Sequence, residues 1–386
     1  AQATREQKQR LREFSKLLQR NQTSVKNFTV FDQLKKDPTR TQLLLKSLPA
    51  WIMNPDDVAR LFPCEPGLFD VVIVDEASQV DLPSILPVVY RGQKVVVAGD
   101  LKQMQARRFA FTAGAIADEA WRRHKVIEHD PDGFFQPLKQ SLLDLSAVRS
   151  EEDVLLDEHF RCLPPIIEFS NERWYGGRLR IMTDERRKRF GPPEQPIIEL
   201  HHVADGEVRE GGQENQHEAE ALLAKLTELL SHPAYAGATF GVICLFDDQV
   251  ALARDLVTEQ VGQELWERHQ LVVVNPDGFQ GDERDVILYS LSYDANQMSK
   301  AAIAARMSAD TYVQGMLNVA FTRARDEIHV FHTAPVDSFC FGDGRPSALS
   351  AWLEHCRTVQ GRGRQSAPNA NWAEPIHSLK LKWPKH

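Results

Sequence analysis

The sequence has no apolar run long enough to cross a membrane, and its first residues do not form a secretory signal. A membrane-spanning helix needs about 20 consecutive apolar residues, so we expect no membrane contact. The five cysteines lie far apart and form no C-x-x-C pair. This spacing argues against cysteine-bound zinc or an iron–sulfur cluster, and it predicts reduced thiols and a cytoplasmic location.

An excess of positive charge is also missing, because 46 Lys and Arg against 54 Asp and Glu give a net charge of −8. The overall charge therefore does not indicate a nucleic-acid-binding protein. Basic residues are nevertheless concentrated in 1–46, with eleven against four acidic residues, and in 345–386, with seven against two. Each stretch is either a solvated face or a segment that follows a phosphate backbone.

A phosphate-binding loop of the form G-x-x-x-x-G-K-[ST] is absent, and no Gly-Lys pair occurs anywhere in the sequence. Such a loop supplies the backbone amides, the lysine and the hydroxyl group that hold nucleotide phosphates and Mg²⁺. Its absence excludes a complete nucleotide site of that kind within these 386 residues. The chain begins with Ala1 inside a charged helical pattern, so we expect it to be a piece of a longer protein.

Two short apolar runs are the strongest signal that is present. Val71–Val74 and Val95–Ala98 are rich in β-branched residues, nearly continuous and too short for a buried helix. They predict neighbouring strands of a parallel α/β sheet, covered on both faces. Asp75-Glu76 follows the first run and Gly99-Asp100 follows the second. Because ligands bind beyond the carboxyl ends of such strands, these groups should face one crevice.

This arrangement suits phosphoryl transfer with a magnesium ion. A carboxylate such as Asp75 can hold Mg²⁺, directly or through water, since Mg²⁺ prefers oxygen ligands. Glu76 lies one step further along the chain and could orient or deprotonate a water for attack on a terminal phosphate. The alternative is that both residues only end a strand and cap the turn that follows.

Asp75-Glu76-Ala77-Ser78 and the G-D-x-x-Q pattern at 99–103 together resemble motifs II and III of superfamily 1 helicases. The resemblance is strongest to the 5′-to-3′ branch that includes the nonsense-mediated-decay helicase. It implies that Asp75 coordinates Mg²⁺, that Glu76 is the catalytic base of ATP hydrolysis, and that Gln103 senses the γ-phosphate. One difference is that Met104-Gln105-Ala106 stands where Leu-Pro-Pro usually follows in this group.

The segment Pro49–Pro55 resembles a P-x-W-x-M-S-P stretch that precedes motif II in the family. There the serine lies near the nucleic-acid backbone, and here Asn54 replaces it. Asparagine can also donate to a phosphate, so the resemblance implies a nucleic-acid contact by Asn54. The alternative is that Trp51 and Met53 belong to the core and that Asn54 only begins a turn.

Leu155–Pro165, followed by a predicted helix, resembles motif IV. By that resemblance Arg161 reaches across an interdomain cleft to the γ-phosphate, and a plain surface arginine is the alternative. Further along, a buried strand at 240–245 is followed by Gln249, where the family often has T-P-Y-x-x-Q. Only the glutamine and an aromatic residue of that pattern remain, and they imply a nucleic-acid contact by Gln249.

A glycine-containing turn between two apolar strands brings backbone N–H groups close to an anion or a ligand. The turn Gly278–Glu283 lies between two such strands, and the stretch F-Q-G-x-E-x-D-V-I at 279–287 resembles motif V. The resemblance places Gln280, Gly281 and Glu283 at the nucleotide, with Gln280 linking it to the nucleic-acid side.

Gly315–Arg325 is predicted to form a helix, followed by a strand at 327–331. Arg323 and Arg325 would then lie about 200° apart around the helix axis and could not face one phosphate. The stretch N-V-A-x-T-R-A at 318–324 resembles motif VI and assigns the inward position to Arg323. Arg161 and Arg323 would together neutralise the transferring phosphoryl group, whereas Arg325 can compensate the helix dipole.

The ordered motifs predict an α/β fold with two RecA-like P-loop NTPase domains, whose parallel sheets are flanked by helices. The first domain should be incomplete in this chain. We expect four segments: a basic helical lead-in at 1–48, the C-terminal part of the first RecA-like domain at 49–140, the second RecA-like domain at 141–342, and a C-terminal helix with a basic flexible tail at 343–386.

The resemblance implies an ATP-dependent helicase or translocase motor on single-stranded DNA or RNA, with ATP and Mg²⁺ held between the two domains. The phosphate-binding loop is then expected upstream in the same protein, and this chain alone should bind ATP weakly and hydrolyse it negligibly. One alternative is a non-catalytic module that binds nucleic acid or a partner, which the retained catalytic set argues against. Another is an ATP-driven remodeller of nucleoprotein complexes that does not unwind.

Overall fold

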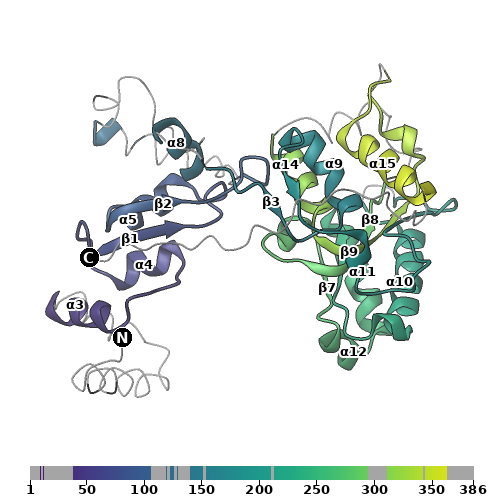
Figure 1. Cartoon of the computed structure of the whole chain (residues 1–386), viewed down its shortest axis with the longest axis horizontal. Coiled ribbons are helices and arrows are strands. Elements are labelled where there is room, and N and C mark those ends of the chain that lie inside the picture. The colour runs from purple at the N-terminus through teal and green to yellow at the C-terminus, as the bar shows by residue number, and fades with distance from the viewer. Residues whose placement is uncertain are drawn as a thin grey trace. The chain divides into compact units, whose positions relative to one another are not determined.

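The chain divides into two units, residues 1–158 with 306–320 and residues 159–305 with 321–386 (Figure 1). Most of residues 1–37 in the predicted helical lead-in, most of residues 106–139 and the predicted tail beyond residue 362 lie outside the described residues. The computed structural model describes residues 38–105, 140–150, 154–209, 213–293, 311–341 and 344–362, and also residues 9, 12, 119, 122–125 and 128.

The first unit is built around two parallel strands, β1 (Phe69–Val74) and β2 (Gly92–Val97), in which Val72 lies opposite Val95. The helix α5 (Leu82–Val89) connects them, as a parallel pair requires. Around this pair lie the helices α3 (Pro38–Ser47), α4 (Pro55–Leu61) and α8 (Leu142–Arg149). The two predicted strands are therefore confirmed, and so is their parallel order.

Among the described residues, a core covers only one face of β1. Val72 and Val74 are buried in a core that also holds Leu82 and Ile85 of α5, together with residues of α4 and α8. Their neighbour Ile73 points the other way, and 70% of its surface is exposed. The prediction that both faces of these strands are covered is wrong for this chain, because the described sheet has two strands and its helices pack on one side.

The second unit contains a five-stranded parallel sheet in the order β5-β9-β8-β6-β7. The central strand β8 is buried at all seven positions, which explains its continuous apolar sequence. This sheet confirms the predicted α/β fold class. The strands are β5 (Ile198–His202), β6 (Phe240–Cys244), β7 (Val272–Val274), β8 (Arg284–Ser290) and β9 (Ala324–His332).

Helices cover both faces of this sheet. On one face Leu222 and Leu226 of α10 pack with Val286, Leu288 and Phe331 of the strands. Burying a side chain of this size stabilises a fold by about 1.5–3 kcal/mol. The helices of the unit are α9 (Pro164–Tyr175), α10 (Gln216–Ser231), α11 (Asp247–Gln260), α12 (Gln263–Arg268) and α15 (Ala348–Arg362); the short elements are β3 (Glu158–His159), β4 (Arg180–Ile181), η1 (Glu185–Arg187), η2 (Pro233–Tyr235), η3 (Asp277–Phe279) and η4 (Val336–Phe339).

On the opposite face Trp352 of α15 is fully buried. Its ring stacks on Phe321 with a centroid distance of 3.8 Å and meets Tyr289 of β8 edge to face at 5.5 Å. Tyr289 and Leu288 are neighbours on β8 and so point to opposite faces. The sheet therefore lies between α15 on one side and α10 on the other.

The helix predicted to run to residue 325 is shorter. The helix α14 covers Thr311–Phe321, and β9 begins at Ala324. Residues 324–331 of β9 pair with β8 on one side, and residues 328–332 pair with β5 on the other. Those ladder bonds outweigh the local helical pattern. Arg323 therefore precedes a strand and Arg325 lies on it, so neither the helical separation of the two arginines nor the dipole role of Arg325 is correct.

Within the described residues, the structure contains no helix of the length and hydropathy that crossing a bilayer requires.

Candidate active site

The turn after β1 holds the two carboxylates in a constrained conformation. Glu76 has φ 50°, in the left-handed region that residues with a side chain rarely adopt. Its backbone N–H donates to Asp75 Oδ1 at 2.9 Å, and Gln79 Nε2 donates to Glu76 Oε2 at 3.3 Å. Such a backbone costs about 1–3 kcal/mol and is concentrated at functional sites. Asp75 itself is exposed.

The turn after β2 lies beside the turn after β1. The backbone N–H of Ala77 donates to the carbonyl of Ala98 at 2.9 Å, and Ser78 Oγ donates to the carbonyl of Met104 at 3.2 Å. Gly99 is needed here, since an added Cβ would lie 3.0 Å from the nitrogen of Ala77. The carboxyl ends of the two strands therefore meet at one edge of the sheet, as predicted from their sequences.

Gln103 is held at this edge by Asp100. Gln103 Nε2 donates to Asp100 Oδ2 at 3.1 Å, and the backbone N–H of Lys102 donates to Asp100 Oδ1 at 2.8 Å. The structure thus places Asp75, Glu76 and Gln103 on the same edge of the first unit.

The helix α14 packs tightly against this second turn, which the sequence did not indicate. Asn318 Nδ2 donates to the carbonyl of Lys102 at 2.9 Å. A Cβ added to Gly315 would overlap the carbonyl of Gln103 and lie 3.0 Å from the nitrogen of Met104. Gly315 therefore has a packing requirement that only the tertiary structure reveals.

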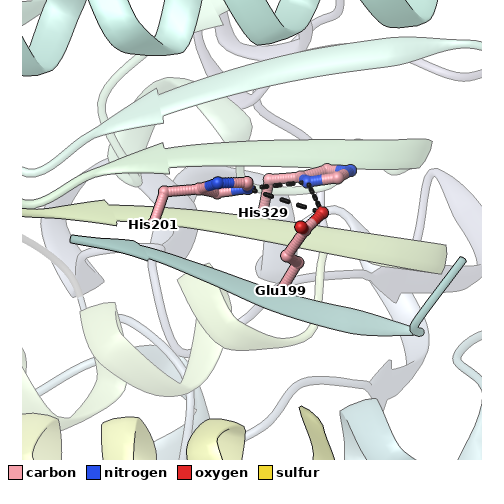
Figure 2. A group of neighbouring side chains, drawn as sticks. All are labelled: Glu199, His201 and His329. Atoms are coloured by element: carbon pink, nitrogen blue, oxygen red, sulfur yellow. Dashed lines mark hydrogen bonds and ion pairs between the residues drawn. The ribbon is translucent and has the colours of Figure 1, made fainter. Parts of the chain in front are cut away.

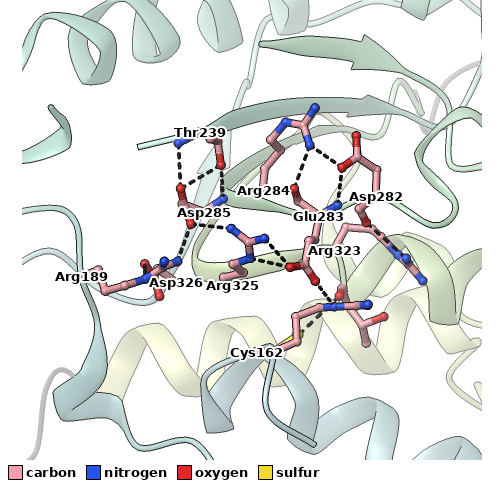
Figure 3. Close-up of polar contacts among 12 residues, drawn as sticks. Cys162, Arg189, Thr239, Asp282, Glu283, Arg284, Asp285, Arg323, Arg325 and Asp326 are labelled. Carbon is pink, nitrogen blue, oxygen red and sulfur yellow. Dashed lines mark hydrogen bonds and ion pairs between the residues drawn. The ribbon is translucent and has the colours of Figure 1, made fainter. Parts of the chain in front are cut away.

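In the second unit, Glu283 is shared by two arginines. Arg161 forms an ion pair with Glu283. Arg325 Nε donates to Glu283 Oε1 at 2.8 Å, and Figure 3 shows these two side chains together. Arg325 Nη1 also donates to Asp285 Oδ1 at 3.2 Å. Burial alone would raise the pKa of Glu283, but the hydrogen bond from Arg325 and the charge of Arg161 hold that pKa below its usual value. Glu283 is therefore a carboxylate at neutral pH.

Arg323 lies next to this network but is buried, with 2% of its surface exposed. Its Nη1 donates to the carbonyl of Asp282 at 3.3 Å. Arg325, which the sequence assigned to a helix end, is about one-third exposed and contacts Glu283 directly. The structure therefore adds Arg325 and Asp285 to the residues that surround Glu283.

The motif V turn has the backbone that its glycine predicts. Gly281 has φ 78°, a conformation that favours glycine. The two polar atoms of the Gln280 side chain are inaccessible to solvent and have no hydrogen-bond partner among the described residues. Buried polar groups normally have partners, so a ligand or a rearrangement of this turn could supply them.

The two residues predicted to contact nucleic acid differ in their surroundings. Asn54 is exposed and precedes α4, without a side-chain cap bond. Trp51 packs edge to face against Phe62 at 5.4 Å, so its ring belongs to the core. Gln249 is fully buried, and its Nε2 donates to Ser290 Oγ at 2.9 Å while its Oε1 accepts from the backbone N–H of Asn215 at 2.7 Å. The structure therefore gives Gln249 a structural role.

Comparison with known proteins identifies the family. Two family models, each described as an AAA domain, match residues 57–109 and 138–334, and the second alone covers half of the chain. The chain belongs to the AAA-domain family of superfamily 1 helicases. Within it, the chain belongs to the branch that includes the nonsense-mediated-decay helicase.

The relatives of this helicase-family chain are longer proteins. It is 33% identical over 305 residues to an uncharacterized ATP-dependent helicase of Mycoplasma genitalium. The matched region covers 76% of this chain and 25% of that protein. It is 25% identical to a 5′-3′ DNA helicase of Mus musculus over 82% of this chain and 16% of that protein. The chain thus spans a quarter or less of the length of these two relatives.

Solved structures with a similar backbone include an arterivirus helicase, nonstructural protein 10, in complex with DNA. That comparison has a TM-score of 0.31 and 11% identity and covers 68% of this chain and 39% of the other. The C-terminal domain of a possible DNA helicase from a Lactobacillus has a TM-score of 0.26 and 11% identity, and covers 50% of this chain and 92% of the other.

The two family matches divide the predicted site residues between them. Asp75, Glu76 and Gln103 lie in the first match, and Arg161 and Arg323 lie in the second. In this helicase-family chain, motifs II and III therefore belong to one unit and the arginine motifs to the other.

Proposed function

We propose that the protein is an ATP-dependent helicase motor that moves along single-stranded nucleic acid. In this proposal Asp75 holds Mg²⁺, Glu76 is the catalytic base that activates water, and Gln103 senses the γ-phosphate. The observation that carries it is the edge of the first unit, where the turns after β1 and β2 are joined by backbone hydrogen bonds. An exposed carboxylate at such an edge fits the oxygen ligands that Mg²⁺ prefers, and Mg²⁺ would neutralise phosphate charge there.

The arginines of the second unit would neutralise the charge of the transferring phosphoryl group. Arg161 already pairs with a carboxylate, Glu283. A phosphate oxygen can replace that carboxylate, while Arg325 keeps Glu283 paired. We propose the same function for Arg323, which must first become accessible. Gln280 and Gly281 would complete the nucleotide contacts from the turn between β7 and β8.

The phosphate-binding loop would come from an upstream segment of the same protein. The sequence has no G-x-x-x-x-G-K-[ST]. In the first unit, Val71 and Ile73 of β1 are 48% and 70% exposed to solvent. Apolar strand residues of this kind are normally covered in a parallel sheet. Both observations support a partner segment that completes the first sheet and grips the phosphates.

ATP binding would close the two units and hydrolysis would release them, which moves the motor by one step along the strand. Asn54 is proposed to contact the nucleic-acid backbone, and the direction is proposed to be 5′ to 3′. A binding module without turnover is less consistent with the strained Glu76 and the paired Arg161. An unwinding assay distinguishes a helicase from a remodeller that hydrolyses ATP without unwinding.

The test uses the intact protein, with its upstream segment, and duplexes that carry a single-stranded tail. We expect ATP hydrolysis that single-stranded DNA or RNA stimulates at least about tenfold, and unwinding of 5′-tailed but not blunt duplexes. Stimulated hydrolysis without unwinding would identify the remodeller instead. The 386-residue chain alone should hydrolyse ATP negligibly. Robust stimulated turnover by that chain would contradict the proposed upstream loop.

A further inference from the structure

Three potential metal ligands that the proposed ATP hydrolysis does not use meet on the α10 face of the second sheet. Glu199 and His201 lie on the edge strand β5, and His329 lies on β9 directly opposite Glu199 (Figure 2). His201 follows Glu199 by two residues, so both side chains point to the same face. The sheet register therefore brings the three groups together, although 128 residues separate His201 from His329.

The distances among the three ligand atoms match a metal site. His201 Nε2 lies 3.1 Å from His329 Nδ1, His329 Nδ1 lies 3.3 Å from Glu199 Oε2, and His201 Nε2 lies 3.6 Å from that oxygen. Ligand atoms about 2.0–2.2 Å from a tetrahedral zinc ion lie about 3.3–3.6 Å from one another. We propose that Glu199, His201 and His329 bind a divalent transition-metal ion, with zinc as the preferred ion.

The surroundings of His329 support this assignment. Its second ring nitrogen, Nε2, lies 2.6 Å from Glu327 Oε1. Glu327 is fully buried and also accepts a hydrogen bond from Tyr235 at 2.7 Å and pairs with Lys188. A carboxylate behind a ligating histidine fixes the proton on the far nitrogen and turns the near nitrogen toward the metal. With that proton on Nε2, the lone pair of His329 Nδ1 is available to a metal ion held by Glu199 and His201.

The site is open on one side. The side chain of His201 is 22% exposed and that of Glu199 is 26% exposed, whereas His329 is buried. An ion can therefore enter from the edge of the sheet, and a water molecule can occupy the fourth position. Two imidazoles and one carboxylate with an open position form a donor set that zinc uses in proteins.

Without a metal, the same groups form a hydrogen-bonded network. Gln195 Nε2 donates to Glu199 Oε2 at 2.8 Å. Burial opposes protonation of His329, but the hydrogen bonds from its ring to Glu199 and Glu327 raise its pKa above the usual value. Burial and the nearby charge of His329 lower the pKa of His201 to about 4. The other charged or titratable groups near the cluster are Lys225 and Glu228 on α10, Lys188 before β5, and Tyr235 after α10.

A metal ion would replace the direct contacts among the three ligand atoms. The ion would also tie the edge strand β5 to β9. At a free zinc concentration near 100 times Kd, the Tm of the second unit should rise by roughly 5 °C.

The experiment titrates Zn²⁺ into the metal-stripped 386-residue chain by calorimetry. We expect one site per chain. His201→Ala should weaken that site at least about 100-fold. His202→Ala is the matched control, since His202 points to the opposite face of β5 and bonds to the carbonyl of Thr333.

Cobalt gives an independent readout, because four-coordinate Co²⁺ absorbs visible light far more strongly than six-coordinate Co²⁺. We expect the strong spectrum in the unmodified chain and in His202→Ala, and its loss in His201→Ala and Glu199→Gln. Glu199→Gln keeps the shape of the side chain and serves if His201→Ala does not fold. Equal zinc affinity in all folded variants, or a six-coordinate cobalt spectrum in the unmodified chain, would overturn the proposal.

Discussion

Glu218 is an acid inside the second unit whose protonation should control stability. It is fully buried in the first turn of α10 and accepts hydrogen bonds from Ser290 Oγ at 2.7 Å, the backbone of Ser292 at 2.8 Å and Thr333 Oγ1 at 3.1 Å. Burial raises its pKa to about 7, although these hydrogen bonds act in the opposite direction.

A carboxyl whose folded pKa lies above its unfolded pKa stabilises the fold most below the unfolded value, near 4.5. This contribution falls as the pH rises toward 7, by up to about 3 kcal/mol. Glu218→Gln stays neutral at every pH, so it should remove that part of the pH dependence of the free energy of unfolding. Denaturant unfolding at pH 5 and pH 8 measures the difference.

Glu220→Gln is the control for Glu218→Gln. Glu220 lies two residues further along α10, is exposed and accepts a hydrogen bond only from Gln216 among the bonds described, at 2.7 Å. Glu220→Gln should leave the pH dependence of the free energy of unfolding unchanged. A Glu218→Gln chain with the same loss of stability between pH 5 and pH 8 as the unmodified chain would contradict the assignment.

At the residue scale, the sequence predicted the chemistry of side chains better than their accessibility. Asp75 and Glu76 stand at a strand end because the apolar run before them is unambiguous. The burial of Arg323 and Gln249 was not predictable, since it depends on Asp282, Asn215 and Ser290, which are brought near by other elements. The interaction of Arg325 with Glu283 was missed because a helix was expected there.

At the element scale, the contact between α14 and the turn after β2 depends on Gly315. Alanine in a helix is normally more stable than glycine by about 1 kcal/mol. At Gly315 the added methyl group would overlap the backbone of Gln103, so Gly315→Ala should instead destabilise the chain by about 1–3 kcal/mol. Thermal unfolding of the 386-residue chain measures this change.

Gly361→Ala provides a matched comparison on α15. Gly361 is also helical, and an added Cβ would meet no atom within 4 Å. Gly361→Ala should leave the stability of the chain unchanged or raise it slightly. If both alanine substitutions shifted the Tm in the same direction and by the same amount, the close packing of α14 on Gln103 would be refuted.

Element boundaries followed from the sequence where one periodicity was clear. The runs around Val72 and Val286 predicted strands that the structure contains, because continuous β-branched residues suit a buried strand. The boundary at 321–324 was missed because Arg325 and Asp326 are charged residues in a strand that other strands pair on both sides. A local pattern does not show such pairing.

At the scale of the whole molecule, the first unit differs from the second in how well its sheet is covered. The second sheet is buried on both faces, whereas β1 and β2 leave Val71, Ile73 and Val96 exposed by 48–70%. The proposed upstream segment would cover this face and supply the missing phosphate-binding loop. It would also place the strained turn at Glu76 next to the phosphates of ATP.

The most direct test of the motor is Glu76→Gln in the intact protein, with Glu65→Gln as its control. Glu65 is an exposed acid just before β1, so Glu65→Gln should leave ATP hydrolysis unchanged. Glu76→Gln removes the base but keeps the size of the side chain, so nucleic-acid-stimulated ATP hydrolysis should fall at least about 100-fold. Binding of ATP, measured by calorimetry, should stay within about twofold of the unmodified protein. Unchanged turnover in Glu76→Gln would contradict the proposed mechanism.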